Sequence, residues 1–125
     1  MIEQWKPIPD YEGYFEASDL GRIRSLERKC KNKHGYRLKK GKVLKPSVHW
    51  SKYLYVNLWK DNNPIKKLVH VLVISAFRGK KEGKETVDHI NFDRQDNRLK
   101  NLEYCSLKEN IRRYLSVKEK LQAIA

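Results

Sequence analysis

The sequence predicts an α+β fold in a single domain of 125 residues. Residues 1–63 hold short runs of alternating apolar and polar side chains, separated by Gly, Asp and Asn, a pattern typical of antiparallel β-hairpins. Residues 64–125 hold a long apolar run, two strand-like segments around a polar loop, and a tail compatible with a helix. A chain of this length builds one modest core, so both parts are expected to share it.

The first part is expected to form an antiparallel β-sheet of hairpins. Ser18–Gly21 has the residue types of a tight turn, and it would join two strands within residues 14–26. A second turn is expected at Gly41, which would close a hairpin within residues 36–44.

The middle of the chain is expected to add a third hairpin. Tyr53–Trp59 is rich in the aromatic and β-branched residues that favour a strand, and Asp61–Pro64 has turn composition before a second strand over residues 65–68. The apolar run Val69–Phe77 that follows is ambiguous by periodicity, because a buried strand and a buried helix segment give the same pattern.

The last part of the chain reads as strand, loop, strand and helix. A strand is expected to end at Asp88-His89, because a polar loop follows, and a bend there would keep one of the two side chains from turning away. Ser106 and Glu109 have the spacing of a capping box. A helix is therefore expected to begin just after Ser106 and to carry Asn110 in its first turn.

These residue types have the chemistry of phosphodiester cleavage with one metal ion. Such a cut needs a base that activates water and a divalent cation that neutralises the phosphate and the leaving oxygen. His89 is the candidate base, since an unperturbed imidazole is largely neutral at cellular pH, and Asp88 and Asn110 are candidate metal ligands. Asn101, which would hold the loop in shape, is counted with His89 in the catalytic set, and Asn97 is expected to brace the loop. Two oxygen ligands and no thiolate favour Mg²⁺ or Mn²⁺ over zinc.

A structural zinc site is not expected. Cys30 and Cys105 stand alone, without a Cys-x-x-Cys or a Cys/His pair at zinc spacing. His70, inside the apolar run, is a second-tier candidate that could contact DNA or support the metal site. The favoured interpretation is a core histidine satisfied by hydrogen bonds, because no carboxylate stands beside it at ligand spacing.

The charge of the chain predicts a nucleic-acid partner. Its 28 Lys and Arg against 15 Asp and Glu give a net charge of +13, and a field of that sign attracts polyanions. The cations concentrate between Arg22 and Lys45, where Glu27 is the one acidic residue, so residues 1–63 are expected to dock DNA. The alternative, a solvated surface, is favoured for any single lysine. The residues expected to contact DNA phosphates are Arg22, Arg24, Arg28, Lys29, Arg37, Lys39 and Lys40.

Motifs along most of the chain carry a resemblance to a known family. They are Trp5–Pro9, Tyr11–Ser18, Leu20–Leu26, Val69–Phe77, Val87–Ile90, Asn97, Asn101–Glu103 and Glu109–Asn110. In this order they resemble the HNH endonucleases of the ββα-metal class, in the branch common in phages and mobile introns. The first three motifs look like the modular segment that precedes such nuclease cores in homing endonucleases.

The resemblance implies a fold and a role for several residues. It places a ββα-metal HNH core with a C-terminal helix in residues 64–125, and it favours a buried helix over Val69–Phe77 that ends near residue 79. It implies that His89 is the general base, that Asp88 and Asn110 hold the metal, and that the product carries a 5′-phosphate. The family often has Asp-Gly directly after the His-Ile pair, whereas this chain has Asn-Phe at residues 91–92.

The combined interpretation is a metal-dependent DNA endonuclease, nicking or homing-type and phage-associated, that acts on double-stranded DNA. No run of about 18 apolar residues and no signal-peptide layout is present, so a cytoplasmic protein of a bacterial or phage-infected cell, without membrane contact, is expected. Two alternatives remain: a non-catalytic DNA-binding module derived from such a nuclease, and an RNA-directed nuclease or accessory protein. Site specificity would either be loose or come from the N-terminal sheet, a homodimer or a phage packaging partner.

Overall fold

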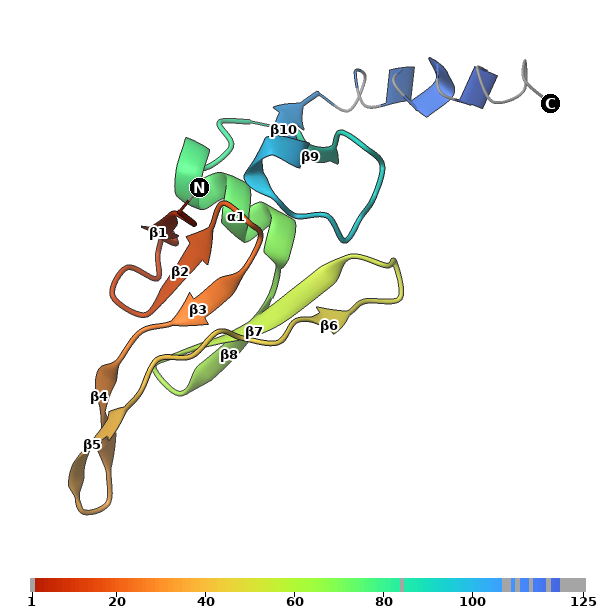
Figure 1. Ribbon diagram of the computed structural model, residues 1–125. Helices are drawn as coiled ribbons and strands as arrows, with labels where there is room; N and C mark the ends of the chain where they lie inside the picture. Colours follow the sequence, from red (N-terminus) through yellow and green to blue (C-terminus); the bar gives the residue numbers. More distant parts are fainter. Residues whose placement is uncertain are drawn as a thin grey trace.

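The computed structural model describes residues 2–83, 85–106, 109, 111–112, 114–116 and 118–119. Within them the chain has small antiparallel sheets around one central α-helix, so the predicted α+β class is confirmed (Figure 1). No helix in these ranges is long and apolar enough to cross a membrane.

The N-terminal sheet contains β1 (Trp5–Pro7), β2 (Phe15–Ser18) and β3 (Ile23–Ser25) in the order β1-β2-β3. The strands pair antiparallel, and the Ser18 side chain accepts hydrogen bonds from the backbone of Leu20 and Arg22 to close the β2–β3 turn. This confirms the first predicted hairpin. The inward side chains of β2 and β3 are buried in the core.

A long hairpin made of β4 (Arg28–Asn32) and β5 (Gly35–Lys39) extends away from the rest of the molecule (Figure 1). The prediction of a hairpin turn at Gly41 is therefore wrong. The turn lies at residues 33–34, because Asn32 Oδ1 accepts the backbone N–H of His34 and Gly35 follows with a φ of 117°.

The third sheet contains β6 (Ser47–Val48), β7 (Leu54–Lys60) and β8 (Asn63–Leu68) in the order β6-β7-β8. Asp61 and Asn62 between β7 and β8 have φ of 54° and 61°, as the two central residues of a tight hairpin turn require. The third predicted hairpin is confirmed. Strand β8 crosses the boundary after residue 63, so the two expected parts of the chain share this sheet.

Helix α1 (Val69–Arg78) begins directly after β8 and ends at Gly79, as expected. It lies between the N-terminal sheet, the β7–β8 hairpin and the last two strands (Figure 1). Residues from all of these elements contribute to the core around α1. Early and late segments of the chain therefore pack against the same helix. The buried core residues are Ile8, Tyr11, Phe15, Ala17, Ile23, Val56, Leu58, Val69, Leu72, Val73, Ile74 and Leu102.

The last sheet pairs β9 (Thr86–His89) with β10 (Leu102–Cys105) antiparallel, and the short 3₁₀ helix η1 (Leu99–Asn101) precedes β10. After β10, Glu109 donates its backbone N–H to Ser106 Oγ at 3.2 Å, and its carboxylate accepts the backbone N–H of Ser106 at 3.4 Å. The predicted capping box is confirmed, and the described residues from 109 to 119 are helical.

Candidate active site

The candidate site lies where β9 ends. Asp88 and His89 are 6% and 5% exposed, and the backbone turns directly after them, with the N–H of Phe92 bonded to the carbonyl of His89 at 2.9 Å. Both residues line one pocket of about 260 Å³, together with Tyr53 and Arg94. The expected bend at the end of the strand is therefore present, directly after the two residues.

His89 is held by an asparagine side chain. Its Nε2 lies 2.9 Å from Oδ1 of Asn97, which is 4% exposed. An amide oxygen only accepts hydrogen bonds, so in this arrangement Nε2 carries the imidazole proton. Nδ1 is then the ring nitrogen that can accept a proton. The contact thus selects the tautomer that a general base needs.

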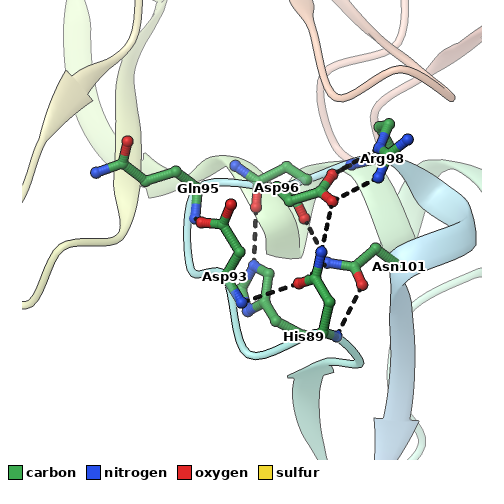
Figure 2. Close-up of polar contacts among 8 residues, drawn as sticks. His89, Asp93, Gln95, Asp96, Arg98 and Asn101 are labelled. Carbon is green, nitrogen blue, oxygen red and sulfur yellow. Dashed lines mark hydrogen bonds and ion pairs between the residues drawn. The ribbon is translucent and has the colours of Figure 1, made fainter.

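Asn101 closes the base of the loop between the two strands. Its Oδ1 accepts the backbone N–H of Asn91 at 3.0 Å, and its Nδ2 donates to Asn91 Oδ1 and to the carbonyl of Asp96, both at 2.9 Å (Figure 2). Asn101 therefore makes the loop-bracing contacts that the sequence suggested for it. Asn97, expected only to brace the loop, contacts the imidazole of His89.

Further polar contacts stiffen the same loop. Arg98 forms an ion pair with Asp96, with Nη2 and Oδ2 2.7 Å apart, and Asn91 Nδ2 donates to the same carboxylate at 2.8 Å (Figure 2). The bonds from Arg98 hold the pKa of Asp96 well below its usual range, although partial burial opposes this shift. Asp93 accepts the backbone N–H of Gln95 at 3.0 Å. These contacts cross-link the loop between β9 and β10.

The turn between β2 and β3 of the N-terminal sheet contacts this loop. The backbone N–H of Leu99 donates to the carbonyl of Asp19 at 2.9 Å. Gly21 has a φ of 87°, and a Cβ at this position would lie 2.8 Å from the backbone carbon of Asn97. The sequence analysis treated Gly21 only as a turn residue, because nothing in its local sequence shows which loop it contacts.

An aromatic cluster forms one wall of the site. The His70 ring lies 4.8 Å from the His89 ring and 4.9 Å from the Tyr53 ring, measured between centroids. Burial, and to a lesser degree the neighbouring His89, lower the pKa of His70 to about 4, so His70 is neutral at cellular pH. Arg94 stacks over Tyr53 at 5.2 Å and donates from Nη1 to the carbonyl of Ser51 at 2.8 Å. Sequence reasoning missed Tyr53 and Arg94 at this site.

Comparison with known families covers nearly all of this architecture. The model of the HNH endonuclease family matches residues 67–112, which include α1, Asp88, His89 and the asparagine-braced loop. The chain belongs to the HNH endonuclease family. A second family model, the NUMOD4 motif, matches residues 3–59, which hold the N-terminal sheet and the long hairpin. The prediction of a phage-type HNH nuclease with an N-terminal modular segment is confirmed.

Individual relatives agree with these two matches. The chain is 30% identical over 114 residues to the DNA endonuclease I-HmuI of Bacillus phage SP01, covering 90% of this chain and 58% of that protein. It is 31% identical over 113 residues to the uncharacterized HNH endonuclease L247 of Acanthamoeba polyphaga mimivirus, covering 87% of this chain and 25% of the relative. The chain therefore spans between a quarter and about three fifths of these curated relatives.

A solved structure has the same fold. The structure described as DNA binding and cleavage by the HNH homing endonuclease I-HmuI superposes with a TM-score of 0.74 at 29% identity. The superposition covers 98% of this chain and 66% of the other. The arrangement of N-terminal sheets and nuclease core seen in Figure 1 is thus shared with a homing endonuclease of this family.

One predicted metal ligand of the HNH core can be located. Asp88 lines the same pocket as His89, and a carboxylate oxygen is a donor that fits Mg²⁺ or Mn²⁺. Asn110, the second predicted ligand, lies outside the described residues. No group of three His, Cys, Asp or Glu side chains suited to a metal gathers in the described parts of the chain.

The structure divides the predicted DNA contacts into two groups. Arg22 is paired with Glu3, and Arg24 Nη2 lies 2.6 Å from Glu16, while both guanidinium groups stack over the Trp5 ring. These carboxylates stand outside the cationic stretch, where Glu27 is the one acidic residue, so their pairing could not be foreseen from that stretch. Both arginines face the same ring, because residues two apart in an extended segment point to the same side.

The other predicted contacts lie on the hairpin and the segment that follows it. Arg28 stacks over Tyr14 at 4.8 Å and donates to the carbonyl of Trp59 at 3.3 Å, which fastens the base of the hairpin to the core. The remaining four side chains are exposed. These exposed cations are Lys29, Arg37, Lys39 and Lys40.

Proposed function

We propose that this HNH protein is a metal-dependent DNA endonuclease in which His89 is the general base. The single observation that carries the proposal is the buried hydrogen bond between His89 Nε2 and Asn97 Oδ1, at a histidine that lines the same pocket as Asp88. This bond keeps a proton on Nε2 and leaves Nδ1 to accept one. A buried imidazole with a fixed tautomer beside a carboxylate is the pair that hydrolysis of a phosphodiester needs.

The reaction begins when His89 Nδ1 takes a proton from water as the water oxygen attacks phosphorus. Asn97 keeps the ring oriented during this transfer, and its Oδ1 stabilises the imidazolium that forms, because the oxygen accepts from Nε2–H. The loop held by Asn101 fixes Asn97 and His89 relative to each other. The bond between phosphorus and the 3′ oxygen breaks, which gives a 5′-phosphate product.

Asp88, with Asn110, would hold one Mg²⁺ or Mn²⁺ ion next to the scissile phosphate. When bound, this cation supplies positive charge that neutralises the developing charge on the phosphate and on the leaving oxygen. HNH endonucleases generally use a divalent metal, and the oxygen-only donors Asp88 and Asn110 suit these two ions. The protein's part is to place the carboxylate and the imidazole on the same pocket wall.

Double-stranded DNA is the proposed substrate. The net charge of +13 and the exposed cations of the β4–β5 hairpin favour a polyanion, and the related structure is described as binding and cleaving DNA. One HNH core contains one base, so we propose that a single protein molecule nicks one strand. A homing role in a phage genome, inside a bacterial or infected cell, follows from the kinship with a phage homing endonuclease.

The test is cleavage of supercoiled plasmid with Mg²⁺ or Mn²⁺. Wild type should give open circles, whereas His89→Ala or added EDTA should stop the reaction, with a loss of about 10²- to 10⁴-fold for the missing base. His49→Ala is the matched control, because that side chain bonds to Ser51 within its own turn. Partial recovery of His89→Ala by added imidazole would support the base role.

Two results would favour other functions. Wild type that shifts plasmid in a gel but leaves it intact under every condition would favour a non-catalytic DNA-binding module. Cleavage of RNA with intact DNA would favour an RNA-directed nuclease. A wild-type enzyme whose nicking is unaffected by the change at His89 would overturn the assignment of the base while leaving the nuclease function in place.

A further inference from the structure

Phe92 occupies a backbone conformation that is unfavourable for a large side chain. Its φ is 63°, in the left-handed region, where glycine is unstrained and an aromatic residue is an outlier. The turn is enforced by the bond from its N–H to the carbonyl of His89 and by the Asx turn in which Asn91 Oδ1 accepts the N–H of Asp93. Strain of this kind is retained where a side chain serves a purpose.

The Phe92 side chain is only partly buried. It is 43% exposed, so it lacks a large part of the stabilisation that a fully buried ring would have. It also lines the pocket that contains Asp88 and His89, next to Tyr114, which is 58% exposed. Ile111 completes this side of the pocket. An exposed apolar rim therefore borders the proposed catalytic pair.

We propose that Phe92 is a DNA-distorting contact that wedges into the base stack beside the scissile phosphate, an inference that rests on the proposed nuclease function. A phosphate placed between Asp88 and His89 brings the sugar and base of the same nucleotide to the rim, because a pocket of about 260 Å³ holds little more than one nucleotide. Apolar side chains that enter a groove partly unstack the base step they touch, and aromatic rings then pack on the exposed base.

Arg94 places a positive charge in the same pocket as the apolar Phe92 ring. Its guanidinium lines the same pocket and is fixed by stacking on Tyr53 and by its bond to Ser51. An arginine so held can contact the phosphate backbone while the neighbouring phenyl ring contacts the base. Phe92 would therefore make cleavage sensitive to how easily the DNA unstacks at the cut, without reading a particular base.

The first experiment distinguishes the effect of the Phe92 ring from that of the backbone conformation at residue 92. Phe92→Gly should keep the fold, since glycine adopts a φ of 63° without strain, and its melting temperature should match that of wild type within a few degrees. Its cleavage of perfectly paired DNA at a mapped site should fall about 10-fold or more, the loss expected for one aromatic–base contact. Phe92→Tyr keeps a ring and should recover most of the cleavage that Phe92→Gly loses.

The second experiment uses the same duplex with a mismatch at the cleaved step, which is already partly unstacked. On this substrate Phe92→Gly should cleave only about twofold more slowly than wild type, because the base step is already partly unstacked without the Phe92 ring. Equal cleavage by the two proteins on paired DNA would overturn the proposal. A deficit that stays the same on both duplexes would also overturn it, because Phe92 would then only support the loop. Wild type that cleaves neither duplex nor plasmid would remove the proposed nuclease function itself, and with it this inference.

Discussion

Gly21 provides a test of whether the N-terminal sheet positions the catalytic loop. In Gly21→Ala the new methyl group would lie 2.8 Å from the backbone carbon and 2.9 Å from the carbonyl oxygen of Asn97, at a residue whose φ is 87°. Gly13 has a φ of 82° and nothing within 4 Å of its Cβ position. Gly13→Ala therefore measures the cost of a positive φ alone, whereas Gly21→Ala measures the same cost together with the steric clash against Asn97.

The magnitudes follow from these distances. A left-handed alanine costs about 1–2 kcal/mol at either position. Gly21→Ala adds an overpacking cost of about 1–3 kcal/mol, because Asn97 must retreat by roughly half an ångström to reach ordinary contact distance. At roughly 4 °C per kcal/mol for a domain of this size, Gly13→Ala should lower the melting temperature by about 4–8 °C and Gly21→Ala by about 8–20 °C.

Cleavage should separate the two variants further. A catalytic group misplaced by about 1 Å can lose about 10²-fold in rate, so a shift of half that size in Asn97 predicts about a 10-fold loss for Gly21→Ala. Gly13→Ala should cleave at the wild-type rate. Thermal unfolding and plasmid nicking, measured well below both melting temperatures, provide the comparison. If Gly21→Ala melts and cleaves like Gly13→Ala, the contact with Asn97 does not position His89.

Three further predictions concern other parts of the molecule. His70 is neutral in the folded protein, because its pKa there is about 4. Its contribution to the free energy of unfolding should therefore be fully present above about pH 6.5 and should decrease as the pH falls from there towards 4. Melting curves of His70→Phe should show a smaller decrease over this pH range. Replacing Lys29 and Lys39 of the long hairpin by Gln should lower the slope of log affinity against log salt by about 2 in anisotropy titrations, and an unchanged slope would exclude both from phosphate contact. Asn101→Ala removes three loop hydrogen bonds and should destabilise the protein by about 2–4 kcal/mol in thermal unfolding, with faster amide exchange at Asn91; unchanged exchange would contradict its bracing role.

Local signals in the sequence predicted several elements of the fold. The capping box of Ser106 and Glu109 uses residues three positions apart, and the turn at Asp61 and Asn62 uses residues that tolerate a positive φ. Interactions over so few residues can be read from the sequence itself. The same holds for the end of β9 at His89, where the polar loop begins.

Other features depend on which distant segments meet, and local patterns do not contain that information. The contact of Asn97 with His89 could not be read from the sequence, because only the fold decides which side chain of the loop faces the ring. Charge counting along the chain likewise placed Arg22 and Arg24 among unopposed cations, although the fold pairs them with Glu3 and Glu16 from earlier segments of the chain. The hairpin at residues 33–34 was missed because a glycine in lysine-rich sequence suggested a later turn.

The bond between Leu99 and Asp19 and the contact between Gly21 and Asn97 join segments that lie far apart in the chain. Contacts of such long range require closure of the long intervening chain, which costs entropy. The support around His89 therefore exists only when the β2–β3 turn has met the loop between β9 and β10. A nascent or partly unfolded chain contains Asp88 and His89 but lacks this support, so the proposed cleavage of DNA is expected only from the folded protein.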